Sequence, residues 1–119
     1  MFAQRLSVVF FAASALLTAC APAEPQEGTP LAVPSDANAQ YFVLEKAGTP
    51  ERPIIVTKRI GSSGTSYSRR EVDCATRTWR YLGTGDTKEQ MNAGPADPNM
   101  TELVPGSIAD VVSTEACRR

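Results

Sequence analysis

The sequence contains no histidine among its 119 residues. Histidine is the usual general base near neutral pH, the commonest metal ligand, and the base of Ser-His and Cys-His catalytic pairs. There is also no surplus of basic residues, because 12 Lys and Arg stand against 13 Asp and Glu, for a formal net charge of -1. A chain with this balance is a poor partner for nucleic-acid phosphates. These absences argue against an enzyme and against a nucleic-acid partner, and no residue pattern indicates a metal or a cofactor.

The sequence also lacks an apolar run long enough to span a bilayer. Its extended uncharged run covers residues 6–19 (LSVVFFAASALLTA). As a helix this run rises about 21 Å, short of the roughly 30 Å hydrocarbon core of a membrane. Arg5 precedes it and supplies the positive charge that is typical of the start of a signal peptide. We therefore interpret residues 1–19 as a signal peptide for export.

The predicted signal peptide ends in Leu17-Thr18-Ala19, directly before Cys20. This ending resembles the lipobox of bacterial lipoproteins, with an aliphatic residue at minus three and small residues at minus two and minus one. The resemblance implies cleavage before Cys20 and acylation of Cys20, palmitate included, and two or more acyl chains anchor a protein stably. The alternative is an ordinary secretory signal that is cut at the small-x-small site Ala19-Cys20-Ala21.

The number of cysteines favours the lipoprotein. Three is an odd number for an exported chain, and assigning Cys20 to lipid leaves Cys74 and Cys117 as an even pair. Residue 21 is Ala21 rather than the Asp that often retains such proteins in the inner membrane of Gram-negative bacteria. By resemblance to that rule, the outer membrane is favoured over the inner membrane.

Composition divides the remaining chain at about residue 40. Residues 20–39 carry the lipidated Cys20 and then a stretch rich in Pro, Ala, Glu and Gln, with few large aliphatic side chains. Such a stretch buries little, so we expect a flexible linker that holds the domain away from the membrane. Residues 40–119 contain runs that favour strands, separated by turn residues, and their length allows one small domain.

Four runs in this domain are predicted to be strands: residues 41–47, 53–60, 66–74 and 77–82. The last two are predicted to pair as a hairpin. Side chains alternate between the two faces of a strand, so three groups are each expected to share a face. They are Ile54, Val56 and Ile60 in the second strand, Ser68, Arg70, Val72 and Cys74 in the third, and Trp79 and Tyr81 in the fourth.

Two helices are predicted. Residues 87–90 (TKEQ) have the form of a capping box and indicate a short helical turn up to Met91. Ser107 is the expected N-cap of a helix at the carboxyl end, with an acidic residue three positions later. The apolar stripe of this second helix consists of Ile108, Val111, Val112 and Ala116. The sequence thus predicts an α+β fold, a small antiparallel sheet with a C-terminal helix packed on one face.

We expect a disulfide between Cys74 in the third strand and Cys117 at the end of the second helix, because exported proteins oxidise paired thiols. In the chain-entropy model this bond stabilises the fold by roughly 4 kcal/mol. Cys117 lies half a turn round an ideal helix from Ile108, so we expect the last turn to loosen. The alternative is two free thiols.

Three segments together resemble the surface-adhesin protein E-like family of Gram-negative bacterial lipoproteins. They are residues 72–74 with 77–82 (VDC, RTWRYL), residues 103–108 (LVPGSI) and the closing Ala116-Cys117. The resemblance implies an antiparallel sheet with a disulfide-linked C-terminal helix, displayed on the cell surface or facing the periplasm. Named adhesins of the family bind host proteins such as vitronectin and laminin, and some form dimers. The resemblance does not extend to their ligand-binding segments, so the ligand does not carry over to this chain.

Basic and aromatic residues alternate along the predicted strands, and such a face could bind an anionic polymer such as a glycan. The alternative is a solvated face whose cations pair with Glu45, Glu71 and Asp73. The basic and aromatic residues are Lys58, Arg59, Tyr67, Arg69, Arg70, Arg77, Trp79, Arg80 and Tyr81.

The sequence as a whole predicts a lipid-anchored envelope or surface protein with a small non-enzymatic domain. The predicted partners are a membrane, through the lipid on Cys20, and an extracellular protein or glycan, and the family resemblance adds a homodimer. The alternative function is a structural or assembly role facing the periplasm. A hydrolase that uses Ser and carboxylates is the third class considered, but residues 61–64 (GSSG) lack the spacing of a nucleophile elbow and are expected to be a loop.

Overall fold

The computed structural model describes residue 9, residues 12–15 and residues 26–118. Cys20 and most of the predicted signal peptide lie outside the described residues, so export and lipidation stay predictions. Among the residues that are described, no helix is both long enough and apolar enough to cross a bilayer.

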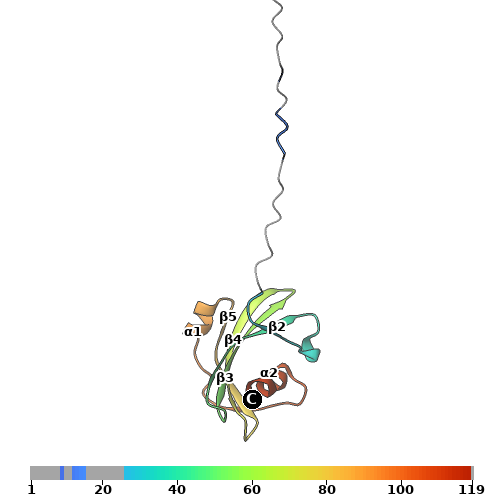
Figure 1. The fold of residues 1–119 in the computed structure, drawn as a ribbon. Helices are drawn as coiled ribbons and strands as arrows, with labels where there is room; N and C mark the ends of the chain where they lie inside the picture. Colours follow the sequence, from blue (N-terminus) through green and yellow to red (C-terminus); the bar gives the residue numbers. More distant parts are fainter. Residues whose placement is uncertain (1–8, 10–11, 16–25, 119) are drawn as a thin grey trace, which may run out of the picture.

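The domain is built on one six-stranded antiparallel sheet (Figure 1). Each strand pairs with its neighbours in the sequence, in the order β1-β2-β3-β4-β5-β6, so no crossover is needed. The predicted hairpin is confirmed, with Val72 opposite Trp79 and Arg70 opposite Tyr81. The strands are β1 (Thr29–Leu31), β2 (Gln40–Gly48), β3 (Pro53–Gly61), β4 (Gly64–Asp73), β5 (Thr78–Gly85) and β6 (Thr101–Glu102).

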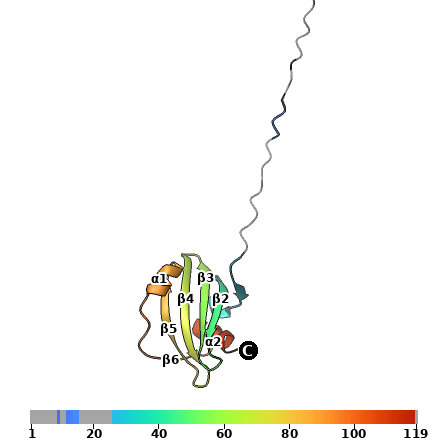
Figure 2. The same ribbon diagram turned by 60° about the vertical axis from the view of Figure 1, so that its left-hand side comes forward.

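Three short helical segments accompany the sheet (Figures 1 and 2): η1 (Pro34–Asp36), α1 (Lys88–Ala93) and α2 (Ile108–Cys117). Both predicted N-caps form. The Thr87 hydroxyl accepts a hydrogen bond from the Gln90 N–H, and the Ser107 hydroxyl accepts one from the Asp110 N–H, each at 3.1 Å. The predicted turn up to Met91 is therefore a real helix, which continues to Ala93.

The core lies between α2 and the middle of the sheet. Ile55 of β3 and Val72 of β4 are fully buried there against Val112 and Ala116 of α2. The prediction of an α+β fold, with the C-terminal helix packed on one face of a small antiparallel sheet, is confirmed.

The predicted apolar face of β3 is only partly right. Ile55, which alternation placed with the polar residues, is the one in the main core, whereas Ile60 is 36% exposed. Val56 is buried on the other face of the sheet, near Met91 of α1. A Cβ at Gly83 would collide with the Met91 carbonyl, so the absence of a side chain there lets α1 lie close to β5. β3 is thus covered on both faces, and alternation alone does not identify the main core.

The predicted linker, residues 20–39, is too long. Its second half forms β1 and η1 and belongs to the domain. β1 pairs with β2, and Val33 is buried at 7% exposure. Composition pointed to a linker because this segment is rich in Pro and Ala. An edge strand tolerates Pro30, because an edge strand has one side without a hydrogen-bonding neighbour.

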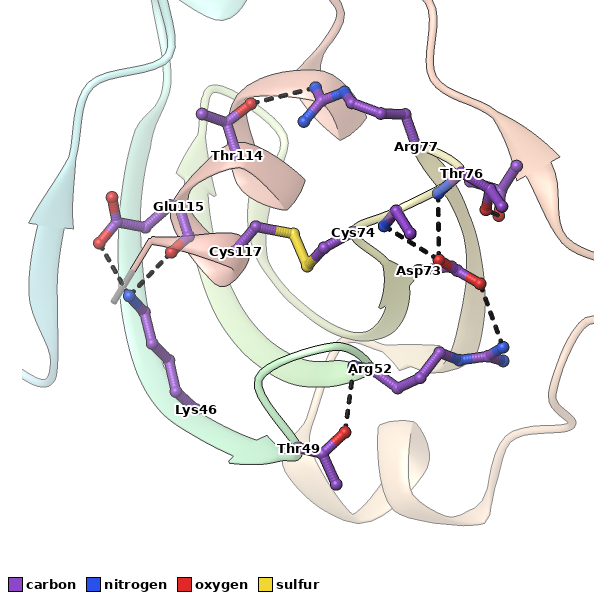
Figure 3. The surroundings of a disulfide bond; sticks show 12 residues. Lys46, Thr49, Arg52, Asp73, Cys74, Thr76, Arg77, Thr114, Glu115 and Cys117 are labelled. Atoms are coloured by element: carbon purple, nitrogen blue, oxygen red, sulfur yellow. Dashed lines mark hydrogen bonds and ion pairs between the residues drawn. A yellow bond between two sulfur atoms is a disulfide. The ribbon is translucent and has the colours of Figure 1, made fainter.

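The predicted disulfide between Cys74 and Cys117 is present, with the two Cα atoms 5.9 Å apart (Figure 3). The expected loosening of the last turn is wrong, since α2 continues as a helix to Cys117. Ser113 is fully buried as well, so the buried face of α2 is wider than the apolar stripe and reaches Cys117 at its edge.

Polar contacts secure both ends of α2. The Lys46 ammonium of β2 donates to the Glu115 backbone oxygen at 2.8 Å and to its side chain at 3.0 Å. Near the start of α2, Arg77 donates to Asp110 and, at 3.3 Å, to the Thr114 hydroxyl. These contacts tie α2 to β2 and to the turn before β5, on either side of the disulfide (Figure 3).

Replacing Cys74 and Cys117 together by Ser should lower the free energy of unfolding by roughly 4 kcal/mol, because the unfolded chain regains the entropy of the open loop. Urea denaturation measures this difference. Reductant should bring the wild-type protein to the stability of the variant and should leave the variant unchanged. Equal unfolding midpoints for the oxidised wild type and the double variant would contradict a stabilising bond.

Candidate functional site

A cleft opens where α2 leaves the sheet uncovered. A helix of ten residues is about 15 Å long, whereas a strand of ten residues such as β4 is about 33 Å long. α2 packs on the part of the sheet that carries Ile55 and Val72, so the polar part of the same face stays open. The cleft has a volume of about 630 Å³ and is walled by η1 and by the first residues of α2.

Alternate residues of the central strands form the floor of this cleft. β4 contributes Ser66, Ser68 and Arg70, and β3 contributes Thr57 and Arg59. The predicted grouping of Ser68, Arg70, Val72 and Cys74 on one face of β4 is confirmed, because Val72 and Cys74 continue that row into the core. One row of side chains therefore supplies both the core and the cleft.

Arg70 is the unusual residue of the cleft, because its side chain is charged and yet only 4% exposed. One terminal nitrogen donates to the Thr57 hydroxyl at 3.0 Å, and the other donates to the Tyr81 hydroxyl at 3.3 Å. The guanidinium carbon lies 5.6 Å from the centre of the Trp79 ring and 4.9 Å from that of Tyr81. These rings meet edge to face, 4.7 Å apart, and both line the cleft. Hydroxyls and π-faces thus hold the cation.

Arg70 has no carboxylate within ion-pair distance among the described residues. Its Nε is buried and has no hydrogen-bond acceptor in this part of the chain. Buried charges in proteins are normally paired, since removing an ion from water is costly. The cleft therefore contains a fixed positive charge without a counter-ion from the described protein.

The acid in the cleft, Asp36 of η1, is already occupied by Arg59. Arg59 donates to the two Asp36 oxygens at 2.8 and 3.4 Å, and the Tyr41 hydroxyl donates to the same carboxylate at 2.6 Å. The hydrogen bonds from Arg59, and then the one from Tyr41, hold the pKa of Asp36 below its usual value. Burial, and then the Asp36 carboxylate, raise the pKa of Tyr41. Asp36 and Arg59 neutralise each other and leave Arg70 as the net charge.

The basic and aromatic residues that the sequence placed together are divided between the two faces of the sheet. Four of the predicted residues line the cleft: Arg59, Arg70, Trp79 and Tyr81. The other predicted basic and aromatic residues, all of which the structure describes, do not line it. Lys58 lies 5.9 Å from the centre of the Tyr67 ring and pairs with Glu27 at 3.6 Å, away from the cleft. A continuous basic face is therefore not formed.

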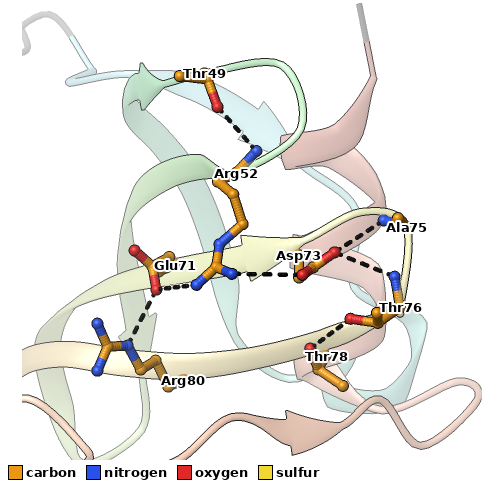
Figure 4. A network of polar contacts seen from close by, with 8 residues as sticks. All are labelled: Thr49, Arg52, Glu71, Asp73, Ala75, Thr76, Thr78 and Arg80. Carbon is orange, nitrogen blue, oxygen red and sulfur yellow. Dashed lines mark hydrogen bonds and ion pairs between the residues drawn. The ribbon is translucent and has the colours of Figure 1, made fainter.

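The alternative of charge pairing is right only in part. Four of the six predicted cations have an ion pair among the described residues, but Arg80 alone pairs with one of the predicted acids, Glu71. Arg80 donates to Glu71 at 3.1 Å, and Arg52, which the sequence analysis did not single out, bridges Glu71 and Asp73 at 3.0 and 3.4 Å (Figure 4). The backbone N–H of Thr76 is the main cause of the lowered pKa of Asp73. Glu45, by contrast, makes no ion pair with any described residue.

The Asp36–Arg59 pair and the isolation of Arg70 do not follow from the sequence pattern. Asp36 lies in the segment predicted to be a linker, for which no contact with β3 is expected. The alternation along β4 placed Arg70 beside Val72, on the buried face. A cation in a row that leads into the core was a usable signal for an internal charge.

Other candidate chemistry is not supported. No group of three or more His, Cys, Asp or Glu side chains that could hold a metal ion occurs in the described ranges. The predicted loop at residues 61–64 is a tight turn between β3 and β4, with Ser62 and Ser63 exposed.

No family model matches the chain, and neither the curated proteins nor the solved structures give a significant match.

The Asp36–Arg59 pair predicts a pH-dependent loss of stability. Folding lowers the pKa of Asp36, so the ionised carboxylate contributes to the free energy of unfolding. This contribution is complete above about pH 4, the usual pKa of Asp, and is lost as the pH falls through the lower pKa of the folded state. Asp36→Asn should therefore be less stable than the wild type at about pH 7, and this difference should shrink at about pH 3. Urea denaturation at both pH values measures it.

Asp86→Asn is the matched control, since the Asp86 side chain is exposed and makes no ion pair with the described residues. This variant should remain close to the wild type at both pH values. A stability difference for Asp36→Asn that stays constant between the two pH values would contradict a role for its ionised form.

Proposed function

We propose that this chain is a lipid-anchored envelope protein whose small, non-enzymatic domain binds a ligand in the cleft between the sheet and α2. The observation that carries the proposal is Arg70, a buried cation without a carboxylate partner among the described residues, at the floor of an open cleft. A charge kept in this state reduces the stability of the isolated domain. An anionic group of a ligand would compensate it.

The absence of an activated nucleophile in the cleft supports binding over catalysis. Ser66 and Ser68 need a base to become nucleophiles, and the chain has no histidine. Asp36, the carboxylate in the cleft, is held by Arg59 with a lowered pKa and is therefore a weak base.

The anchor is proposed from the lipobox resemblance at Cys20, and the early start of the domain changes its geometry. Because β1 begins at Thr29, the chain between Cys20 and the domain reaches at most about 30 Å. A linker up to residue 40 would have reached about 70 Å. The cleft should therefore meet its ligand close to the membrane to which Cys20 is attached.

The adhesin-like role is part of the proposal through the family resemblance alone. The family resemblance suggests extracellular proteins or polymers as ligands and the outer membrane of a Gram-negative bacterium as the site of action. The alternative, a structural or assembly role facing the periplasm, agrees equally well with a domain that remains near the membrane.

Lipidation is tested by growing Gram-negative cells that express the full chain with labelled palmitate. The label should appear in the wild type and should be absent from Cys20→Ser, because that variant lacks the thiol that is acylated. Cys74→Ser with Cys117→Ser is the matched control and should keep the label. Incorporation of palmitate into Cys20→Ser would contradict the anchor.

The side of the membrane is tested with a tag after the last residue, since the neighbouring Arg118 is exposed. On intact cells, an antibody should bind this tag if the domain faces outwards, as an adhesin-like role requires. Binding only after the outer membrane has been opened would contradict surface display and support the periplasmic role.

A further inference from the structure

We infer that the cleft at Arg70 binds a saccharide unit that carries a carboxylate. The inference rests on the proposed function, since it names the ligand of the same cleft. The ligand must satisfy three features of the cleft: one unpaired cation, a row of hydroxyl groups beside it, and a wall of aromatic and aliphatic groups.

The charge calls for a singly charged anion. Arg59 and Asp36 pair with each other, so the cleft retains the one positive charge of Arg70. A guanidinium has five N–H donors. Protein hydroxyls accept one from each terminal nitrogen of Arg70, and its Nε–H is buried, which leaves one N–H on each terminal nitrogen for a ligand. The fork of a guanidinium matches a carboxylate through two parallel hydrogen bonds. A carboxylate therefore fits this end of the cleft.

The hydroxyl groups extend in one direction from that charge. Ser66 and Ser68 precede Arg70 at alternate positions of β4 and line the cleft. Successive residues on one face of a strand are about 7 Å apart, so this row is about 13 Å long. Neither serine has a side-chain hydrogen bond to any described residue. Each hydroxyl can both donate and accept, which suits the hydroxyl groups of a sugar.

The walls suit a ring that has apolar faces. Trp79, Tyr81 and Ile108 line the cleft beside Arg70, and the C–H groups of a sugar can pack on such surfaces. The start of α2 adds the backbone N–H groups of Ile108 and Ala109, which come too early in the helix to have acceptors within it. The N-terminal end of a helix carries a partial positive charge, and here that end lines the cleft. A volume of about 630 Å³ is enough for one or two sugar units.

The test measures binding by calorimetry with the full chain, purified in detergent from the envelope. The probes are D-glucuronate, D-glucose, acetate and inorganic phosphate. D-glucuronate should bind at least about 10-fold more tightly than the other three, because it alone combines a carboxylate with sugar hydroxyls. Equal affinity for acetate or phosphate would overturn the saccharide part of the inference, and no binding of D-glucuronate would overturn it entirely.

Variants assign the binding to this cleft. Arg70→Gln should weaken D-glucuronate binding by about 10- to 100-fold, the effect of losing hydrogen bonds to a charged group. Arg80→Gln is the matched control, because Arg80 pairs with Glu71 outside the cleft, and it should bind as the wild type does. Unchanged binding by a folded Arg70→Gln protein would overturn the inference.

Ser66→Ala with Ser68→Ala keeps the test valid if Arg70→Gln does not fold, since both serines are only partly buried. This variant should weaken D-glucuronate binding by about 3- to 10-fold, the effect of lost neutral hydrogen bonds. Unchanged binding would overturn the assignment of the hydroxyl row.

Two further arms identify the source of the sugar and separate this inference from the proposed function. If polyglucuronate binds at least about 10-fold more tightly per sugar unit than D-glucuronate, the ligand is a polymer. Equal affinity indicates a free sugar acid or a chain end, and either result supports the site. The second arm is a pull-down with the same full chain. A protein that wild type and Arg70→Gln capture equally, with no binding of D-glucuronate to either, would overturn the sugar site and leave a protein-binding domain. No captured protein and no binding of D-glucuronate would overturn both the sugar site and the proposed binding function.

Discussion

The packing of α2 on β3 and β4 is the interaction on which the rest of the structure depends. Val112 and Ala116 of α2 bury Ile55 and Val72 of the sheet, and the disulfide from Cys74 to Cys117 holds the end of the helix in place. Because α2 is about half the length of the strand that it covers, the same packing that closes the core leaves the cleft open. Fold and candidate site thus share one cause.

Arg70 marks the boundary between the core and the cleft. It precedes Val72 by two residues and lies on the same face of β4, so it is buried next to the core. The rings of Trp79 and Tyr81, together with two hydroxyls, hold the cation. Lys58, Arg59 and Arg80 of the central strands each pair with a carboxylate. Arg69 lies outside the cleft and, like Arg70, has a buried Nε without an acceptor among the described residues. A ligand of the proposed site must therefore bring one opposite charge.

The segment before β2 has a double role. Its strand β1 closes the edge of the sheet, and η1 brings Asp36 to Arg59 at the mouth of the cleft. The same early start of the domain shortens the chain available between Cys20 and β1. One segment thus contributes to the sheet edge and to the cleft, and if Cys20 is anchored as proposed, the ligand must be accessible near a membrane.

The sequence by itself determined the features that depend on neighbours along the chain: the hairpin of β4 and β5, both helix caps, and the face that joins Arg70 to Val72. Cysteine parity also paired Cys74 with Cys117. Tertiary structure alone decided which face of β3 meets α2, that residues 29–31 join the sheet, and which cations find carboxylates. The physical reason is distance along the chain. Alternation and capping act over a few residues, whereas the Asp36–Arg59 contact and the isolation of Arg70 depend on segments brought together only by folding.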